Sequence, residues 1–210
     1  MGIKSPRSKA EPRSAAGLLV QTPMGWVGAI SRRGKLIATS LPERSRKAAR
    51  AACGVEAAHA ACGLEADFGG DDSLLRGLEG DLRAYFEGKA VDFRRYPVDL
   101  SGHPPFRRRA LMAARLIPYG QVRTYGWLAA RCGQPKGARA AGQAMSKNTL
   151  PLVIPCHRVV GAGGALTGFG GGLELKRALL AREGIASDEG RASLGVGRGS
   201  TSRRGSGGTV

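Results

Sequence analysis

A cysteine and a histidine stand side by side at Cys156 and His157, within the segment PLVIPCHRVV that spans residues 151–160. Proline fixes φ and removes an amide donor, so the two prolines predict a stiff turn that presents the thiol in one position. A thiol attacks as its thiolate, and because its ordinary pKa is about 8.5 it needs a base or a positive charge nearby. His157 and Arg158 are the candidates in the sequence, and we expect a water to bridge the thiol and the imidazole. The alternative is a buried structural cysteine beside an incidental histidine.

A carboxylate that could serve this pair is Glu183, which precedes Gly184 at the predicted end of the last helix. The helix dipole disfavours a negative charge at this end. A residue that breaks a local rule is a candidate for a functional role, and a histidine base needs a carboxylate to fix its tautomer. From its position alone, an exposed glutamate without a role is the simpler interpretation.

The segment ARAAGQAM, residues 138–145, predicts a helix whose surface is almost bare of large side chains. Small residues let a helix backbone approach closely, which suits the minor groove of DNA, about 6 Å wide. Arg139 projects from this face and could fill a gap in a base stack, as apolar wedges do in other proteins. The alternative is an alanine-rich helix packed in a core, with Arg139 reaching out to solvent.

The charge balance favours a polyanionic partner. The chain has 33 Lys and Arg against 16 Asp and Glu, a formal net charge of +17. Such an excess attracts nucleic acid, although basic tails account for part of it. Four cysteines are scattered along the chain without a paired motif, which indicates free thiols in a reducing cytoplasm. No apolar run is long enough for a membrane span, and no apolar segment follows the basic N-terminus as in a secretory signal.

The first half, residues 16–100, is predicted to form a small α/β unit between the chain's N-terminal tail and a breaker. Short runs of β-formers at residues 17–22, 25–30 and 35–39 predict an antiparallel meander. A helical stretch follows Pro42, a glycine-rich loop surrounds residues 69–70, and a second helix begins behind a Ser73 cap. Its apolar face carries Leu74, Leu75, Leu78, Leu82, Tyr85 and Phe86. Residues 93–100 are predicted to be extended.

The second half, residues 101–186, is predicted to be mostly helical, which makes the fold class α+β. The breaker SGHPP at residues 101–105 is the candidate domain boundary. Helices are expected from Pro105, over 125–131, over 138–147 and over 173–183, the last ending at Gly184. The middle two, around the turn at 133–137, resemble a helix-turn-helix. Residues 1–15 and 187–210 are polar and glycine-rich and are predicted to be disordered tails.

The cysteine motif and several others together resemble one family. The segment PCHRVV at 155–160 is similar to the signature of the O6-alkylguanine-DNA alkyltransferases, also called methylated-DNA–protein-cysteine methyltransferases. The same order and spacing extend to IPYG at 117–120, TY at 124–125, ARA at 138–140, Asn148, LTGF at 166–169, GGL at 171–173 and EG at 183–184. The resemblance covers roughly residues 92–186, and the first half resembles the family's N-terminal domain only weakly.

The resemblance implies a fold and a set of roles. It implies a ribonuclease H-like N-terminal subdomain, and a C-terminal subdomain whose helix-turn-helix enters the minor groove and flips the damaged nucleotide out. Cys156 would accept the alkyl group, and His157, oriented by Glu183, would deprotonate it through a water. Tyr125 would help rotate the nucleotide and protonate guanine at N3, and Arg139 would take the vacated place in the stack. Asn148 would steady the turn and hydrogen-bond near the thiolate. The residues implied to contact DNA are Ala138, Ala140, Gly142 and Lys136. The residues implied to line the pocket together with Tyr125 are Met145, Pro151, Val159 and Phe169.

The resemblance also implies a stoichiometric reagent. The partner is double-stranded DNA carrying O6-alkylguanine, with O4-alkylthymine left open, and no cofactor is needed. The protein would be a cytoplasmic monomer, associated with the nucleoid when bound to DNA. Some family members bind zinc in the N-terminal domain, but the spacing of Cys53, His59 and Cys62 does not match a zinc motif.

Two other functions remain open from the residues. One is a DNA-binding module without transfer, and homologues that only sense lesions lack the cysteine that this chain has. The other is a Cys-His hydrolase, which would need an oxyanion hole and would not explain the helix that carries Arg139.

Overall fold

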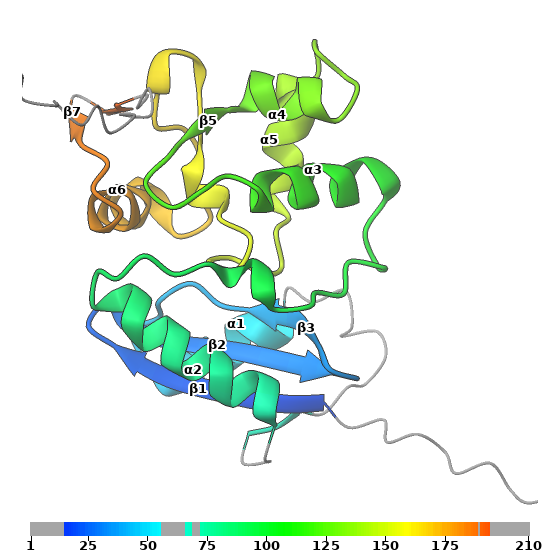
Figure 1. Cartoon of the computed structure of the whole chain (residues 1–210), viewed down its shortest axis with the longest axis vertical. Coiled ribbons are helices and arrows are strands. Elements are labelled where there is room, and N and C mark those ends of the chain that lie inside the picture. Colours follow the sequence, from blue (N-terminus) through cyan, green and yellow to red (C-terminus); the bar gives the residue numbers. More distant parts are fainter. Residues whose placement is uncertain (1–14, 56–65, 69–71, 189, 194–210) are drawn as a thin grey trace, which may run out of the picture.

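The computed structural model describes residues 15–55, 66–68, 72–188 and 190–193. Figure 1 shows two parts, one built on a sheet with two helices and the other built mostly of helices. The tail predicted for residues 1–15 falls outside the described residues except for its last residue, Ala15, which is buried in the first strand. The loop around residues 69–70, together with His59 and Cys62, also lies outside the described residues.

The sheet contains the predicted meander and one further strand. Strands β1 (Ala15–Thr22), β2 (Gly25–Arg32) and β3 (Lys35–Thr39) pair antiparallel, which confirms the prediction. Strand β4 (Ala66–Asp67) adds to β1 in parallel, so the sheet is mixed with the order β3-β2-β1-β4. Strand β4 has only two residues, which are too few to show the alternation of polar and apolar side chains that predicts a strand. The sequence therefore gives no sign of β4.

Both faces of the sheet are covered by helices. Helix α2 (Ser73–Phe86) lies in front of the sheet in Figure 1 and buries its predicted apolar face, while α1 (Arg46–Val55) packs on β2. Gly28 permits the close packing of α1, because a Cβ there would lie 2.8 Å from the Ala49 carbonyl oxygen. The predicted cap of α2 is wrong by one residue: the Asp72 carboxylate, and not Ser73, accepts from the amides of Leu74 and Leu75.

The second half contains four α-helices among the described residues. They are α3 (Pro105–Arg115), α4 (Tyr125–Arg131), α5 (Ala138–Ser146) and α6 (Gly172–Arg182). The predicted bounds of the 125–131 helix are the observed ones. For the other three helices, each end that was predicted lies within one residue of the observed end. Strand β5 (Arg123–Thr124) pairs in parallel with β6 (Val159–Val160).

Within the described residues, short 3₁₀ helices occur at three turns. They are η2 (Phe93–Arg95), η3 (Cys156–Arg158) and η4 (Ala162–Gly164). The first corrects the prediction that residues 93–100 are extended throughout, because the Asp92 side chain accepts from the Arg94 amide and caps a helical turn.

The C-terminal tail predicted from residue 187 is wrong for its first residues. Strands β7 (Ser187–Asp188) and β8 (Arg191–Ala192) pair antiparallel. Ala192 is buried, and the Leu166 amide donates to the Gly190 carbonyl at 2.7 Å. The backbone bonds to the 161–166 loop therefore order a segment whose composition alone predicts disorder. Residues 189 and 194–210 lie outside the described part.

The two halves share one hydrophobic core. Its largest cluster contains Val20 and Leu36 of the sheet together with Leu150 and Ile154 of the cysteine-bearing segment. The backbone of Thr39 at the end of β3 donates to the Thr149 carbonyl at 3.0 Å, and its hydroxyl donates to the Pro151 carbonyl at 2.7 Å. The sheet thus supports the turn on which Cys156 lies. No helix within the described residues is both long and apolar enough to cross a membrane.

Candidate active site

The turn that carries Cys156 is held by its own backbone. The Ile154 amide donates to the Leu150 carbonyl at 2.8 Å, and the Cys156 amide donates to the Ile154 carbonyl at 2.8 Å. Leu152 is a buried non-glycine residue with φ 71°, a conformation that costs energy and persists only where the surroundings impose it. All ten residues of the segment 151–160 are buried, so the turn is a rigid part of the core.

The buried Asn148 side chain bridges this turn. Its Oδ1 accepts from the Leu150 amide at 3.0 Å, and its Nδ2 donates to the Ile154 carbonyl at 2.9 Å. It also acts to lower the pKa of the Cys156 thiol. An amide has enough donors and acceptors to meet all of these groups. This arrangement agrees with the expectation that Asn148 steadies the turn.

His157 and Glu183 lie together although they are far apart in the sequence. The imidazole Nε2 is 2.7 Å from Glu183 Oε1, and both side chains are buried. Nδ1 of His157 is buried and has no hydrogen-bond partner among the described residues. Because an ionised carboxylate only accepts, the bond to Glu183 places the proton of a neutral imidazole on Nε2 and leaves Nδ1 with a lone pair.

The Glu183 carboxylate is surrounded by donors. Arg158 Nε donates to Oε2 at 2.8 Å and Arg158 Nη2 donates to Oε1 at 3.0 Å, while the Tyr85 hydroxyl donates to Oε1 at 2.8 Å. The Gly120 amide donates to Oε2 at 3.3 Å. Burial alone would raise the pKa of Glu183, but the charges and hydrogen bonds of His157 and Arg158 lower it to about 2. The carboxylate is therefore ionised at neutral pH.

Arg158 does not have the position that its neighbourhood in the sequence suggests. Its guanidinium is bound to Glu183 and to the Ile117 carbonyl, which accepts from Nη1 at 2.7 Å. The positive charge expected beside the thiol is instead used to hold the carboxylate.

The resting state of the pair follows from burial. Burial raises the pKa of the Cys156 thiol, and the hydrogen bond of Asn148 and the charge of Lys176 oppose this only in part. Burial also lowers the pKa of His157, and Glu183 opposes that effect. Both directions favour a neutral thiol beside a neutral imidazole, which has a free base nitrogen.

Lys176 is a site residue that the sequence reasoning missed. It is buried, and its ammonium donates to the Val159 carbonyl at 2.7 Å and to the Thr167 carbonyl at 3.1 Å. Burial lowers its pKa to about 8, while Cys156 acts to raise it. A signal existed: Lys176 stands three and four residues before the apolar Leu179 and Leu180, on the inner face of the predicted helix.

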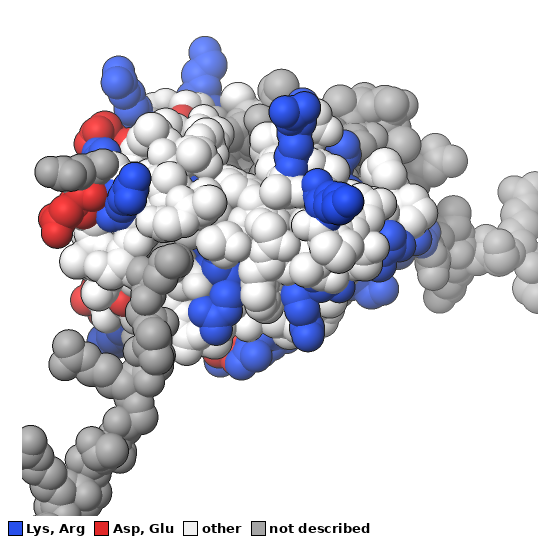
Figure 2. Space-filling model, turned by 90° about the horizontal axis from the view of Figure 1, so that it is seen from above, with Lys and Arg blue, Asp and Glu red and all other residues white. Residues whose placement is uncertain are grey.

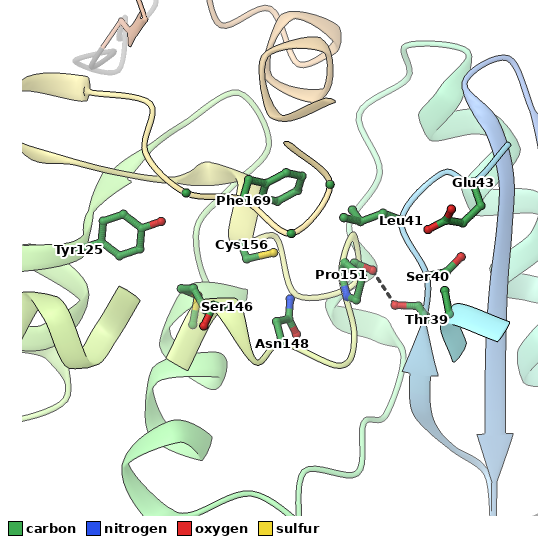
Figure 3. A pocket seen from close by; sticks show the side chains of 15 residues that line it. Thr39, Ser40, Leu41, Glu43, Tyr125, Ser146, Asn148, Pro151, Cys156 and Phe169 are labelled. Atoms are coloured by element: carbon green, nitrogen blue, oxygen red, sulfur yellow. Dashed lines mark hydrogen bonds between the residues drawn. The ribbon is translucent and has the colours of Figure 1, made fainter. Parts of the chain in front are cut away.

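A cavity of about 140 Å³ opens beside Cys156. Figure 3 shows the sulfur between the ring of Phe169 and the side chains of Asn148 and Pro151, with the Tyr125 hydroxyl directed toward this region. Of the residues expected to line it, Tyr125, Met145, Pro151 and Phe169 do so. Val159 is not among its lining residues; it is buried, and its carbonyl accepts from Lys176.

A wider hollow of about 550 Å³ lies at the outer side of this cavity. It shares Tyr125 and Phe169 with the inner cavity, and α5 contributes Ala138, Arg139 and Gly142 to its wall. Ala140 is half-buried, and Lys136 is exposed in the turn before α5, at a separate hollow. Figure 2 looks down on the helical part and shows Lys and Arg side chains spread over it, with most of the visible acidic atoms at one edge.

Known proteins share this arrangement of sequence and fold. Residues 105–185 match the family described as 6-O-methylguanine DNA methyltransferase, DNA binding domain. A methylated-DNA–protein-cysteine methyltransferase of Mycolicibacterium paratuberculosis is 48% identical over 107 residues, which cover 51% of this chain and 64% of that protein. The enzyme of the same name from Methanosarcina acetivorans is 40% identical over 116 residues, which cover 54% of this chain and 72% of that protein.

The similarity to solved structures extends over both halves. The crystal structure of Mycobacterium tuberculosis O6-methylguanine methyltransferase is 32% identical, with a TM-score of 0.63, and the match covers 80% of this chain and 92% of that chain. Mycobacterium tuberculosis OGT in complex with DNA is 33% identical, with a TM-score of 0.65, over 80% and 92% of the two chains. The chain belongs to the methylated-DNA–protein-cysteine methyltransferase family.

Tyr85 is the second site residue that the sequence reasoning missed. Its spacing predicts a place on the apolar face of α2, and it is buried there. Its hydroxyl, however, donates to Glu183, which belongs to the second half of the chain. A tyrosine in an apolar stripe gives no sign of where its hydroxyl points, so this contact could not be predicted from α2 alone.

Replacing Glu183 by glutamine tests the environment assigned to this buried carboxylate. We expect Glu183→Gln to lower the free energy of unfolding at pH 7 by on the order of 3 kcal/mol, because the change leaves Arg158 buried without its counter-charge. The pKa of Glu183 falls from an ordinary 4.5 to about 2 on folding, so its contribution is complete above pH 4.5 and is lost as the pH falls toward 2. Urea unfolding at pH 7 and at pH 3 measures both effects.

The control is Glu174→Gln, which removes an exposed carboxylate from the same helix region and should change stability by less than about 0.5 kcal/mol. An equal loss for the two variants, or a Glu183→Gln loss that does not shrink at low pH, would contradict the assigned environment of Glu183.

Proposed function

We propose that this chain repairs DNA by transferring an alkyl group, foremost methyl, from O6 of guanine to Sγ of Cys156, once per molecule. The observation that carries the proposal is the position of Cys156 in the wall of a cavity, next in the chain to His157, whose Nε2 is bound to the buried Glu183 carboxylate. Residues of α5 line the adjoining outer hollow. Family membership and the DNA complex of the Mycobacterium tuberculosis relative support the same reaction.

Proton transfer from the thiol is assigned to His157. We infer that Nδ1, through one water, takes the proton as Sγ attacks the alkyl carbon. The imidazolium that forms lies 2.7 Å from the ionised Glu183 carboxylate, which stabilises it and fixes the ring. A neutral thiol beside a neutral base becomes an ion pair only as the reaction begins.

The leaving group also needs a proton. When the bond between the alkyl carbon and O6 breaks, its electrons remain on the base, and Tyr125 is the residue assigned to protonate guanine at N3. One proton leaves the thiol and one reaches the base, so the overall transfer is balanced. Lys176 lies with its ammonium 5.8 Å from the Tyr125 ring centre, where its charge stabilises negative charge on the phenol oxygen or on Sγ.

Access to the base requires that the nucleotide leave the duplex. Extrusion costs a few kcal/mol and is easiest for a mispaired lesion. We propose that α4 and α5 act as a helix-turn-helix in the minor groove, with Arg139 in the vacated place, Ala138, Ala140 and Gly142 against the groove and Lys136 near the backbone. We also propose that the first half is a ribonuclease H-like subdomain.

The product explains the stoichiometry. A thioether is a poor leaving group, so the alkylated protein is not regenerated and no cofactor takes part. The same function implies a monomer that works in the cytoplasm and on the nucleoid when it is bound to DNA.

Intact-protein mass spectrometry after incubation with a duplex containing O6-methylguanine tests the transfer. We expect one added methyl per protein molecule, and peptide mapping should place it on Cys156. Cys156→Ser should abolish the mass increase while duplex binding is retained, and Cys132→Ala, which removes another buried thiol, should retain transfer. Repeated turnover, or label on another cysteine, would refute the proposal.

Arg139→Ala tests nucleotide extrusion. The variant should lower the transfer rate constant at saturating duplex by about tenfold or more, since the vacated stack is left unfilled. Its affinity for undamaged duplex should fall by less than about threefold, because only one cationic contact is lost. Arg177→Ala, in which a partly exposed arginine of α6 is removed, should change neither value. Equal losses of affinity and rate for Arg139→Ala would assign it to encounter and not to extrusion.

A further inference from the structure

The cavity beside Cys156 continues past the sulfur to a carboxylate of the N-terminal half. We propose that this far end is a subsite for O6-alkyl groups that end in a hydrogen-bond donor, an ammonium or a hydroxyl, and that the Glu43 carboxylate receives this donor. The proposal rests on the transfer reaction proposed above and names the class of adduct that the site prefers.

The far end is built by residues outside the family's matched DNA-binding region. The end of β3 and the loop after it contribute Thr39, Ser40, Leu41 and Glu43, and α1 contributes Ala52. In Figure 3 Thr39, Ser40 and Glu43 lie farther from Cys156 than Pro151 does, and the Glu43 carboxylate is directed toward Leu41.

The backbone of Glu43 is fixed in place. Its amide donates to the Trp26 carbonyl at 2.8 Å, and its carbonyl accepts from the Trp26 amide at 2.7 Å. Gly25, at φ 125°, lies against it so closely that a Cβ there would be 2.6 Å from the Glu43 carbonyl oxygen. A side chain on such a fixed backbone loses little freedom when it binds a ligand.

The Glu43 carboxylate is the available acceptor at this end. Among the residues that the structure describes, it has neither an ion pair nor a hydrogen bond, and the nearby Arg46 guanidinium lies 6.0 Å from the ring centre of Trp26. The neighbouring hydroxyls are already used: Ser40 accepts from the Gly28 amide at 2.8 Å, and Thr39 donates to the Pro151 carbonyl. A half-buried carboxylate without a partner favours a cationic or donating ligand.

The direction of the substrate brings an alkyl chain to this carboxylate. The base enters from the outer hollow beside Arg139, and its O6 must face Sγ for in-line attack. In-line attack places the alkyl carbon between Sγ and O6, so the rest of a longer chain must leave this line sideways, and the cavity offers it room toward Pro151, Leu41 and Glu43. A cavity of about 140 Å³ exceeds what a methyl group fills, since engineered cavities of about 150 Å³ hold benzene.

Single-turnover transfer from four duplexes tests the subsite in the full chain. The duplexes carry O6-methyl-, O6-butyl-, O6-(4-aminobutyl)- and O6-(3-carboxypropyl)guanine. The rate of transfer from each duplex is measured by the added mass on Cys156. Each rate is then divided by the methyl transfer rate of the same variant. For the wild type we expect aminobutyl to react roughly tenfold faster than butyl, and carboxypropyl to react more slowly than butyl.

Glu43→Gln should remove most of the aminobutyl preference, and Glu43→Lys should reverse the order of aminobutyl and carboxypropyl. The control Glu174→Gln makes the same charge change on the exposed surface and should keep the wild-type order. Equal aminobutyl and butyl rates in the wild type would overturn the subsite while methyl transfer still supported the proposed function. Loss of methyl transfer itself would overturn both proposals.

Discussion

A single buried carboxylate holds the site together. Glu183 binds His157 of the cysteine-bearing turn, Arg158 of the same turn, and Tyr85 of α2 in the N-terminal half. Removing these charges from water costs about as much as their attraction returns, so the intact cluster is about as stable as an apolar replacement would be, and loss of one partner is what destabilises the fold. Because its partners come from both halves of the chain, any change in how the halves pack would also move the imidazole.

The chemistry follows from that constraint together with burial. With Nε2 bound to Glu183, the only base on His157 is Nδ1, and burial keeps the imidazole neutral and the Cys156 thiol protonated at rest. In the proposed transfer, the nucleophile is therefore formed only when a substrate and a bridging water complete the site. Such a thiol avoids the side reactions of a permanently exposed thiolate, which matters for the single turnover that we propose.

The sequence could predict what local patterns encode. The strands of β-formers, the 125–131 helix and the cysteine with its histidine are determined by nearby residues. The break in the dipole rule made Glu183 only a candidate, and its role was implied by the family resemblance. Contacts between residues far apart in the sequence could not be predicted. Arg158 binds Glu183 and not the thiol, and the Tyr85 hydroxyl of the first half binds Glu183 of the second. The hairpin at 187–192 depends on hydrogen bonds to a distant loop. The cap of α2 is Asp72 and not the predicted Ser73; both are suitable cap residues and they are adjacent, so local sequence does not decide between them.

Nitrogen-15 NMR of the three histidines at pH 7, with His157 assigned by comparison with His157→Gln, tests the central claim most directly. The account predicts a neutral His157 with its proton on Nε2 and an unprotonated Nδ1, a state that should persist as the pH falls to 6.5 because burial lowers the pKa of this ring. A proton on Nδ1, or an imidazolium at pH 7, would contradict it.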